Sequence, residues 1–190
     1  MSESTLAGHF LEDALRQFRK YKALAEEALA QVEDRDFFRT LDPESNSVAL
    51  VMKHMAGNMR SRWRDFLTSD GEKPDRNRDT EFVDERGETR ARMRERWEAG
   101  WRQLFEALEP LKPDDLTRTI RIRGEAHTVM QAIHRQLTHY AYHVGQIVFV
   151  AKHFAGDRWK SLSIPKGKSR EFDVAKDGSV YGTPQGPEKA

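Results

Sequence analysis

The chain contains no cysteine among its 190 residues. This absence excludes disulfide bonds, cysteine-ligated zinc or iron–sulfur sites, and a cysteine nucleophile. Any thiol chemistry at this protein would therefore need a thiol that arrives as a cosubstrate.

The chain also lacks a charge excess and a long apolar run. Its 32 Lys and Arg residues nearly balance 31 Asp and Glu residues, so no overall field attracts nucleic acid or an anionic membrane. No apolar stretch approaches the roughly 18 residues of a membrane span. The first residues show neither the basic nor the apolar region of a secretory signal. We expect a soluble, cytoplasmic protein that binds neither nucleic acid nor membrane.

Arginine is dense between Arg60 and Arg102, but Asp and Glu interleave with it throughout. This pattern predicts salt-bridged, solvent-exposed helix faces. Binding of nucleic acid through the same region is the weaker alternative, and it predicts a strongly salt-dependent affinity for DNA.

Four long segments repeat apolar residues at three- and four-residue steps, which is typical of amphipathic helices. They cover about residues 6–32, 48–67, 85–108 and 129–154. Ser47 and Thr128 have the side chains of N-caps for the second and fourth segments. The polar stretch 68–84 predicts a long loop. The alternation at 119–123, followed by a turn at Gly124-Glu125, predicts a small hairpin. The sequence therefore predicts an all-α four-helix bundle with one long crossover loop and a small hairpin before the last helix.

After Gly156 the composition shifts to Gly, Pro, Ser and Lys. We expect one helical domain over residues 1–156 and an irregular tail over residues 157–190. Three apolar residues of the tail are expected to dock on the bundle: Trp159, Leu162 and Ile164. The end of the tail, from Gly178, is expected to be flexible.

Three histidines form the most informative pattern in the chain. His139 and His143 lie four residues apart in the last predicted helix, so their imidazoles point from one face at a separation of about 6 Å. This spacing suits two nitrogen ligands of one metal ion. His54, in a Met-rich apolar stripe of the second helix, would supply a third ligand and leave at least one coordination position open. The pattern leaves two interpretations, an open metal site or core histidines that hydrogen-bond other groups.

The remaining histidines are expected at the surface or at the edge of the fold: His9, His127, His134 and His153. The tail segment 165–169 ends like a phosphate-binding loop. Leu162 stands where that motif requires its first glycine, and no helix is expected to follow, so we do not interpret the segment as a nucleotide site.

Several stretches of the sequence resemble the DinB/YfiT-like superfamily, whose members are classed as metal-dependent enzymes. The resemblance rests on segments 46–63 and 65–74, on His139-Tyr-Ala-Tyr-His143-Val-Gly-Gln146-Ile, and on segment 159–169. More narrowly, the chain is similar to a bacterial branch of this superfamily whose function is unknown.

The resemblance implies a four-helix bundle that is frequently dimeric, so we expect a homodimer. It also implies a divalent metal ion, commonly nickel or zinc, bound by His54, His139 and His143. Imidazole ligands allow iron as well. Characterised relatives include S-transferases and isomerases that use low-molecular-weight thiols such as bacillithiol, mycothiol or glutathione. The narrower branch has no activity that can be transferred to this chain.

Three neutral imidazoles would leave the full charge of a divalent ion to act at the open position. Such an ion lowers the pKa of a bound water towards about 7, and a thiolate could bind at the same place. We therefore expect a metal-dependent enzyme that acts on a small molecule by hydrolysis or thiol transfer. Gln146 and Asn58 are the candidates to orient the substrate or a ligand nitrogen. The alternative is a non-catalytic, dimeric helical scaffold or stress-related binding module with a structural metal or none.

Overall fold

The computed structural model describes residues 6–84, 87–173 and 176. Over these residues the chain is mostly helical, with one small antiparallel sheet of two strands. The α-helices are α1 (Leu6–Leu29), α2 (Asp34–Phe37), α3 (Val48–Trp63), α4 (Arg90–Leu108) and α5 (Val129–Ala155). The strands are β1 (Thr119–Ile122) and β2 (Glu125–Thr128), and the short 3-10 helices are η1 (Asp79–Phe82), η2 (Pro113–Thr117) and η3 (Gly156–Arg158).

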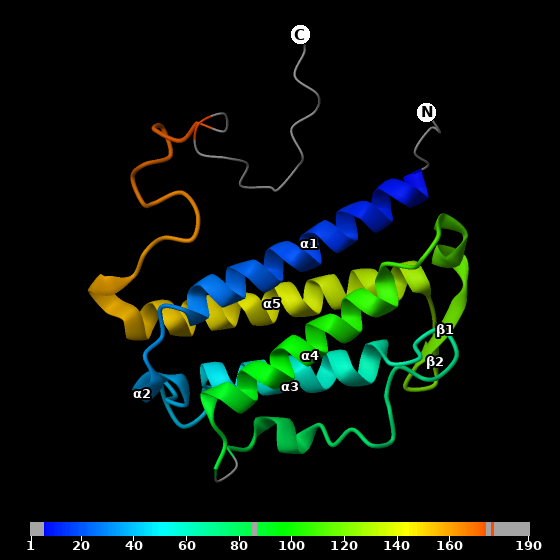
Figure 1. The fold of residues 1–190 in the computed structure, drawn as a ribbon, viewed down its shortest axis with the longest axis horizontal. Coiled ribbons are helices and arrows are strands. Elements are labelled where there is room, and N and C mark those ends of the chain that lie inside the picture. The colour runs from blue at the N-terminus through cyan, green and yellow to red at the C-terminus, as the bar shows by residue number, and fades with distance from the viewer. Residues whose placement is uncertain (1–5, 85–86, 174–175, 177–190) are drawn as a thin grey trace.

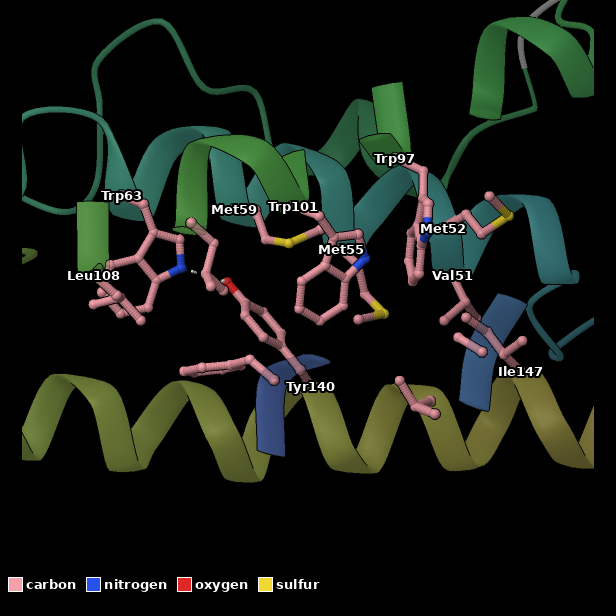
Figure 2. Close-up of a cluster of buried hydrophobic side chains, with 14 of the residues drawn as sticks. Val51, Met52, Met55, Met59, Trp63, Trp97, Trp101, Leu108, Tyr140 and Ile147 are labelled. Atoms are coloured by element: carbon pink, nitrogen blue, oxygen red, sulfur yellow. Dashed lines mark hydrogen bonds between the residues drawn. The ribbon is translucent and has the colours of Figure 1, made fainter. Parts of the chain in front are cut away.

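The four long helices pack side by side, as Figure 1 shows. Helix α3 packs along α4, α1 packs along α5, and α3 also contacts α5. The core between them contains large aromatic side chains from all four helices: Phe18, Trp63, Trp97, Trp101 and Tyr140. In Figure 2 the side chains of α3 and α4 face Tyr140 and Ile147 of α5. Burial of each large apolar side chain contributes about 1.5–3 kcal/mol, so this core stabilises the fold.

The predicted N-caps of α3 and α5 are confirmed. The Ser47 hydroxyl accepts a hydrogen bond from the Leu50 backbone N–H at 3.2 Å, and the Thr128 hydroxyl accepts one from the Gln131 N–H at 3.1 Å. The Gln131 side chain accepts a bond from the Thr128 N–H at 2.8 Å, which completes a capping box. These caps fix where the two helices begin, and therefore where their histidines point.

Two helices end earlier than predicted. Helix α1 ends at Leu29 rather than Val32, because the chain turns there through a hydrogen bond from the Val32 N–H to the Leu29 carbonyl. Helix α3 ends at Trp63 rather than Leu67. Asp65 has a left-handed φ of 48°, which an α-helix does not accommodate.

Two further differences from the prediction are the start of α4 and an additional short helix after α1. Helix α4 begins at Arg90 rather than near residue 85, because the Thr89 hydroxyl caps it by accepting a bond from the Arg92 N–H at 3.2 Å. Residue 85 itself lies outside the described residues. The connection between α1 and α3 contains the short helix α2, which is not among the four predicted helical segments.

The predicted hairpin is confirmed and holds the long loop in place. Strands β1 and β2 pair with Ile122 opposite Glu125. The turn is one residue earlier than predicted, because Glu125 pairs with Ile122 and belongs to β2. Arg123 and Gly124 form the two-residue turn with φ of 57° and 76°, the left-handed values that a type I′ turn requires. The Asp70 carboxylate accepts hydrogen bonds from the backbone N–H groups of both turn residues at 2.8 and 2.7 Å. The loop 68–84 is therefore tied to the hairpin beside α3.

The chain after α5 returns to the helices. The three residues predicted to dock there are half-buried: Trp159, Leu162 and Ile164. The Gln31 side chain makes two hydrogen bonds to the backbone of Lys160, at 3.0 and 2.6 Å. The tail end predicted to be flexible, from Gly178, lies outside the described residues. Among the residues that the structure describes, no helix is long and apolar enough to cross a membrane.

Candidate metal centre

Three imidazoles meet between α3 and α5. His54 comes from the middle of α3, and His139 and His143 come from successive turns of α5. The Nε2 atom of His139 lies 3.4 Å from Nε2 of His54 and 3.1 Å from Nε2 of His143. One ligand atom from each ring lies within 4.8 Å of the other two. The structure thus brings together the three histidines that the sequence pattern singled out.

The hydrogen-bond partners determine which ring nitrogens carry protons. His54 Nδ1 lies 2.8 Å from Glu81 Oε2, and His143 Nδ1 lies 2.8 Å from Gln146 Oε1. Both oxygens are acceptors, so both Nδ1 atoms donate and both Nε2 atoms carry lone pairs. His139 Nε2 can donate one proton to only one of them. At least one close pair of nitrogens therefore has no proton between its members, which is unfavourable unless the rings share a cation.

Burial keeps the imidazoles of His139 and His143 neutral. Desolvation, with smaller effects of the neighbouring imidazoles, lowers the pKa of His139 to about 3. Desolvation also lowers the pKa of His143 to about 4, although the hydrogen bond with Gln146 opposes it. Neutral imidazole is the form that binds a metal ion. Near neutral pH both rings can therefore act as ligands without losing a proton.

The spacing of the nitrogens fits one divalent ion. Imidazole nitrogens that lie about 2.0–2.1 Å from a tetrahedral ion are roughly 3.4 Å from one another. The distances from His139 Nε2, 3.1 and 3.4 Å, are close to that value. His139 Nδ1 is buried and has no hydrogen-bond partner among the described residues. No protein group there sets the tautomer of His139, whereas a metal ion at Nε2 would place the proton on Nδ1.

Glu81 holds His54 in place, and the sequence pattern did not predict this role. It is 5% exposed and receives two hydrogen bonds from Arg76, at 2.8 and 2.9 Å. Burial alone would raise the pKa of Glu81, but the hydrogen bonds from Arg76 and His54 outweigh it and hold the pKa below its ordinary value. The ionised carboxylate keeps the His54 proton on Nδ1, an arrangement common around histidine ligands of metals.

The loop 68–84 brings Glu81 to α3 through its short helix η1. Gly57, one turn after His54, leaves room for the carboxylate, because a Cβ at this position would lie 2.2 Å from Glu81 Oε1. Phe82, which follows Glu81 in the chain, stacks on His54 with ring centroids 4.7 Å apart and an interplanar angle of 29°. A loop that we predicted only as polar therefore forms one wall of the histidine cluster.

The two polar residues proposed beside the histidines have different partners. Gln146 contacts His143 Nδ1, so it orients a ring nitrogen of the cluster. Asn58 lines the cavity beside the histidines. Its Oδ1 accepts hydrogen bonds from Gln136 at 2.6 Å and from the Tyr140 hydroxyl at 2.9 Å. Asn58 is thereby fixed in a buried network.

The cluster faces a cavity of about 700 Å³, a volume typical of small-molecule sites. Of the other histidines, three are exposed: His9, His134 and His153. His127 is half-buried and contacts Arg135 at 3.2 Å. Within the described part of the chain, the three clustered histidines are the group whose ligand atoms have the spacing for a metal ion.

Fold and site together define a mostly helical protein with a three-histidine cluster, compatible with a metal site, beside a cavity. The chain belongs to the family described as Protein of unknown function (DUF1572), which matches residues 5–168. Neither the curated proteins nor the solved structures gave a match. The family match covers all three histidines and the loop that carries Glu81, and it names no activity.

Proposed function

We propose that this protein binds one divalent metal ion through His54, His139 and His143 and acts as a metal-dependent enzyme on a small molecule. The observation that carries the proposal is the convergence of three Nε2 atoms, of which only one can carry a proton. The cavity beside them supports an open site, since a structural metal site is closed by its protein ligands.

The protein's own residues prepare this site. Glu81 and Gln146 hold the protons of His54 and His143 on Nδ1, so both rings present Nε2 to the same point. Phe82 covers one face of the His54 ring and excludes water there. When bound, a divalent ion would supply Lewis acidity and lower the pKa of water at an open coordination position towards about 7.

Two classes of reaction fit these residues. One is hydrolysis of a small molecule, and the other is transfer of a low-molecular-weight thiol. The chain has no cysteine, so the second reaction would take its thiol from a cosubstrate. The volume of the cavity beside the three rings, about 700 Å³, gives either class room for a small substrate.

We further propose that the four long helices form a bundle of the DinB/YfiT-like type. The side-by-side packing of these helices supports the placement, and so does the resemblance of the segments around the three histidines. The placement favours nickel or zinc as the metal, and iron remains chemically allowed because imidazole binds all three ions. It also favours a homodimer, which light scattering of the purified protein tests.

Metal analysis of single variants tests the proposed site. The protein is purified without a His tag, and its metal content is measured for the wild type and for alanine variants at His54, His139 and His143. Each substitution removes one ligand, so we expect the metal stoichiometry to fall in all three. The control is His134→Ala, an exposed residue on the same helix, which should keep the metal. Unchanged stoichiometry in the three ligand variants contradicts the site.

The alternative is a non-catalytic helical scaffold in which the same histidines hold a structural metal. Removal of the ion by a chelator should unfold such a scaffold. The enzyme proposal expects the metal-free chain to keep its helical circular dichroism, because the large hydrophobic core does not include the histidines. Exchangeable water at the metal and inhibition by small thiols would support the enzyme.

A further inference from the structure

The cavity beside the histidines concentrates charge of one sign. Its lining includes five arginines and no Asp or Glu: Arg62, Arg76, Arg78, Arg123 and Arg135. The chain as a whole has 32 Lys and Arg against 31 Asp and Glu. The positive charge of the lining is therefore a local concentration of arginines, which the nearly balanced composition of the whole chain does not explain.

Carboxylates behind the lining compensate only part of this charge. Glu72 Oε2 lies 3.6 Å from Arg62, 3.2 Å from Arg76 and 3.4 Å from Arg123, so one carboxylate is shared among three guanidinium groups. Glu81 pairs with Arg76, and its other oxygen is engaged by a histidine ring. Two carboxylates thus serve three of the five arginines.

The other two arginines have partners of a different kind. Arg78 lies over the ring of Phe82, 5.0 Å from its centroid. Arg135 is exposed and contacts His127 Nε2 at 3.2 Å. In the part of the chain that the structure describes, neither guanidinium pairs with a carboxylate. The cavity therefore keeps an excess of positive charge that a ligand could neutralise.

Arg62 is a buried charge with unused donors. It is 4% exposed, and its Nε and Nη1 atoms are buried without a hydrogen-bond partner among the described residues. Its 3.6 Å contact with Glu72 is longer than a hydrogen bond. Unpaired donors on a buried charged group are costly. An anion in the cavity beside Arg62 would compensate this buried charge.

The position of Arg62 on α3 relates it to the histidine cluster. His54, Asn58 and Arg62 recur at four-residue steps and all line the cavity, so they share one face of the helix. The eight residue-to-residue steps from His54 to Arg62 correspond to about 12 Å along the helix axis. The cavity therefore has a histidine end and an arginine end, and Arg123 lies at the latter because it shares Glu72 with Arg62.

From this arrangement we infer that the cavity binds a small molecule bearing an oxyanion, a carboxylate or phosphate group, held by Arg62 together with Arg123 and Arg135. The opposite end of the molecule reaches the histidines. Guanidinium groups bind both kinds of oxyanion through paired hydrogen bonds. The inference rests on the proposed function, because it assigns a substrate class to the same site. The burial of Arg62 restricts access to small ligands, which disfavours a duplex backbone.

Calorimetric titration with inorganic phosphate and with succinate tests the inference. Both probes are titrated into zinc-free and zinc-loaded protein at low salt. Arg62→Met keeps an unbranched apolar side chain at this position and removes its charge. Arg135→Gln changes an exposed side chain, so it keeps the test valid if Arg62→Met does not fold. Arg102→Gln removes the same charge from an exposed site on α4 outside the cavity and is the matched control.

We expect the wild type to bind at least one probe and Arg62→Met and Arg135→Gln to bind it about 10- to 100-fold more weakly, as for the loss of a charge-assisted hydrogen bond. Arg102→Gln should bind like the wild type. Binding of phosphate alone assigns a phosphate ester, and binding of succinate alone assigns a carboxylate.

Three results overturn the inference: no binding of either probe at millimolar concentrations, equal loss in Arg102→Gln, or preferential, steeply salt-dependent binding of a short DNA duplex. The proposed function fails separately. If the protein binds no zinc but binds a probe through Arg62, the proposed metal site is refuted and the anion site is supported. If it binds zinc but neither probe, the metal site is supported and the anion site is refuted.

Discussion

Gly57 lies on α3 one turn after His54, where an added methyl group would collide with the carboxylate that orients this histidine. A Cβ at Gly57 would lie 2.2 Å from Glu81 Oε1, 2.8 Å from Cδ and 3.2 Å from Cγ. Because non-bonded heavy atoms favour separations of about 3.5–4.0 Å, Gly57→Ala must displace the carboxylate by about 1 Å or more. That displacement breaks the 2.8 Å hydrogen bond to His54 Nδ1.

Two opposing effects set the stability of this variant. Alanine in place of glycine in a helix interior contributes about 1 kcal/mol of stability. Loss of a buried hydrogen bond to a charged group costs about 1.5–3 kcal/mol, so we expect a net loss of about 1 kcal/mol. The effect on metal binding is larger, because loss of a carboxylate that orients a histidine ligand typically weakens the affinity about 10- to 100-fold.

Gly145→Ala is the matched control, because Gly145 also lies in a helix beside a cluster histidine and a Cβ there meets nothing within 4 Å. We expect this variant to gain up to about 1 kcal/mol and to keep its zinc affinity. Zinc affinity is measured by competition with a chromogenic chelator, and stability of the metal-free protein by urea unfolding. Equal zinc affinity in Gly57→Ala and Gly145→Ala refutes the argument that Glu81 orients His54.

Three further predictions follow from the same geometry. Glu81→Gln should weaken zinc binding about 10- to 100-fold in the chelator assay, since a neutral amide replaces the carboxylate; wild-type affinity contradicts this. Tyr140→Phe should lower the free energy of unfolding by about 1–3 kcal/mol, because two buried N–H donors lose their acceptor, whereas exposed Tyr142→Phe should not. The pKa values of His139 and His143, about 3 and 4, lie below the ordinary 6.5 because of burial. Below pH 6.5 the unfolded chain therefore binds more protons than the folded chain. The urea concentration at the unfolding midpoint of the metal-free protein should decrease as the pH is lowered from about 6.5 to 4; a midpoint that does not change with pH contradicts this.

The positions of His139 and His143 could be predicted because local rules set them. Helical spacing places both rings on one face, and the cap at Thr128 fixes where that helix begins. The meeting with His54 depends on how α3 packs against α5. The apolar stripe around His54 indicated that α3 is buried, and the resemblance indicated the partner helix.

Glu81 could not be predicted in the same way, because its role depends on contacts distant in sequence. It lies 27 residues from His54 in a loop whose polar composition is typical of exposed connections. The loop is held against the protein by Asp70, which binds the hairpin turn, and by Arg76, which binds Glu81. Each of these contacts joins segments that no periodicity connects.

Arg62 shows why the dense arginines of this region were only partly understood from the sequence. Salt-bridged, solvated faces were predicted, and this is right for Arg60 and Arg64, which both pair with Asp75 at 3.0 and 2.6 Å. The prediction is wrong for Arg62, which is 4% exposed. At about 100° per residue, Arg62 lies roughly 200° around α3 from Arg60 and therefore points to the opposite side. The carboxylate nearest to Arg62, that of Glu72, is shared with Arg76 and Arg123, so Arg62 keeps charge that the proposed anion would neutralise.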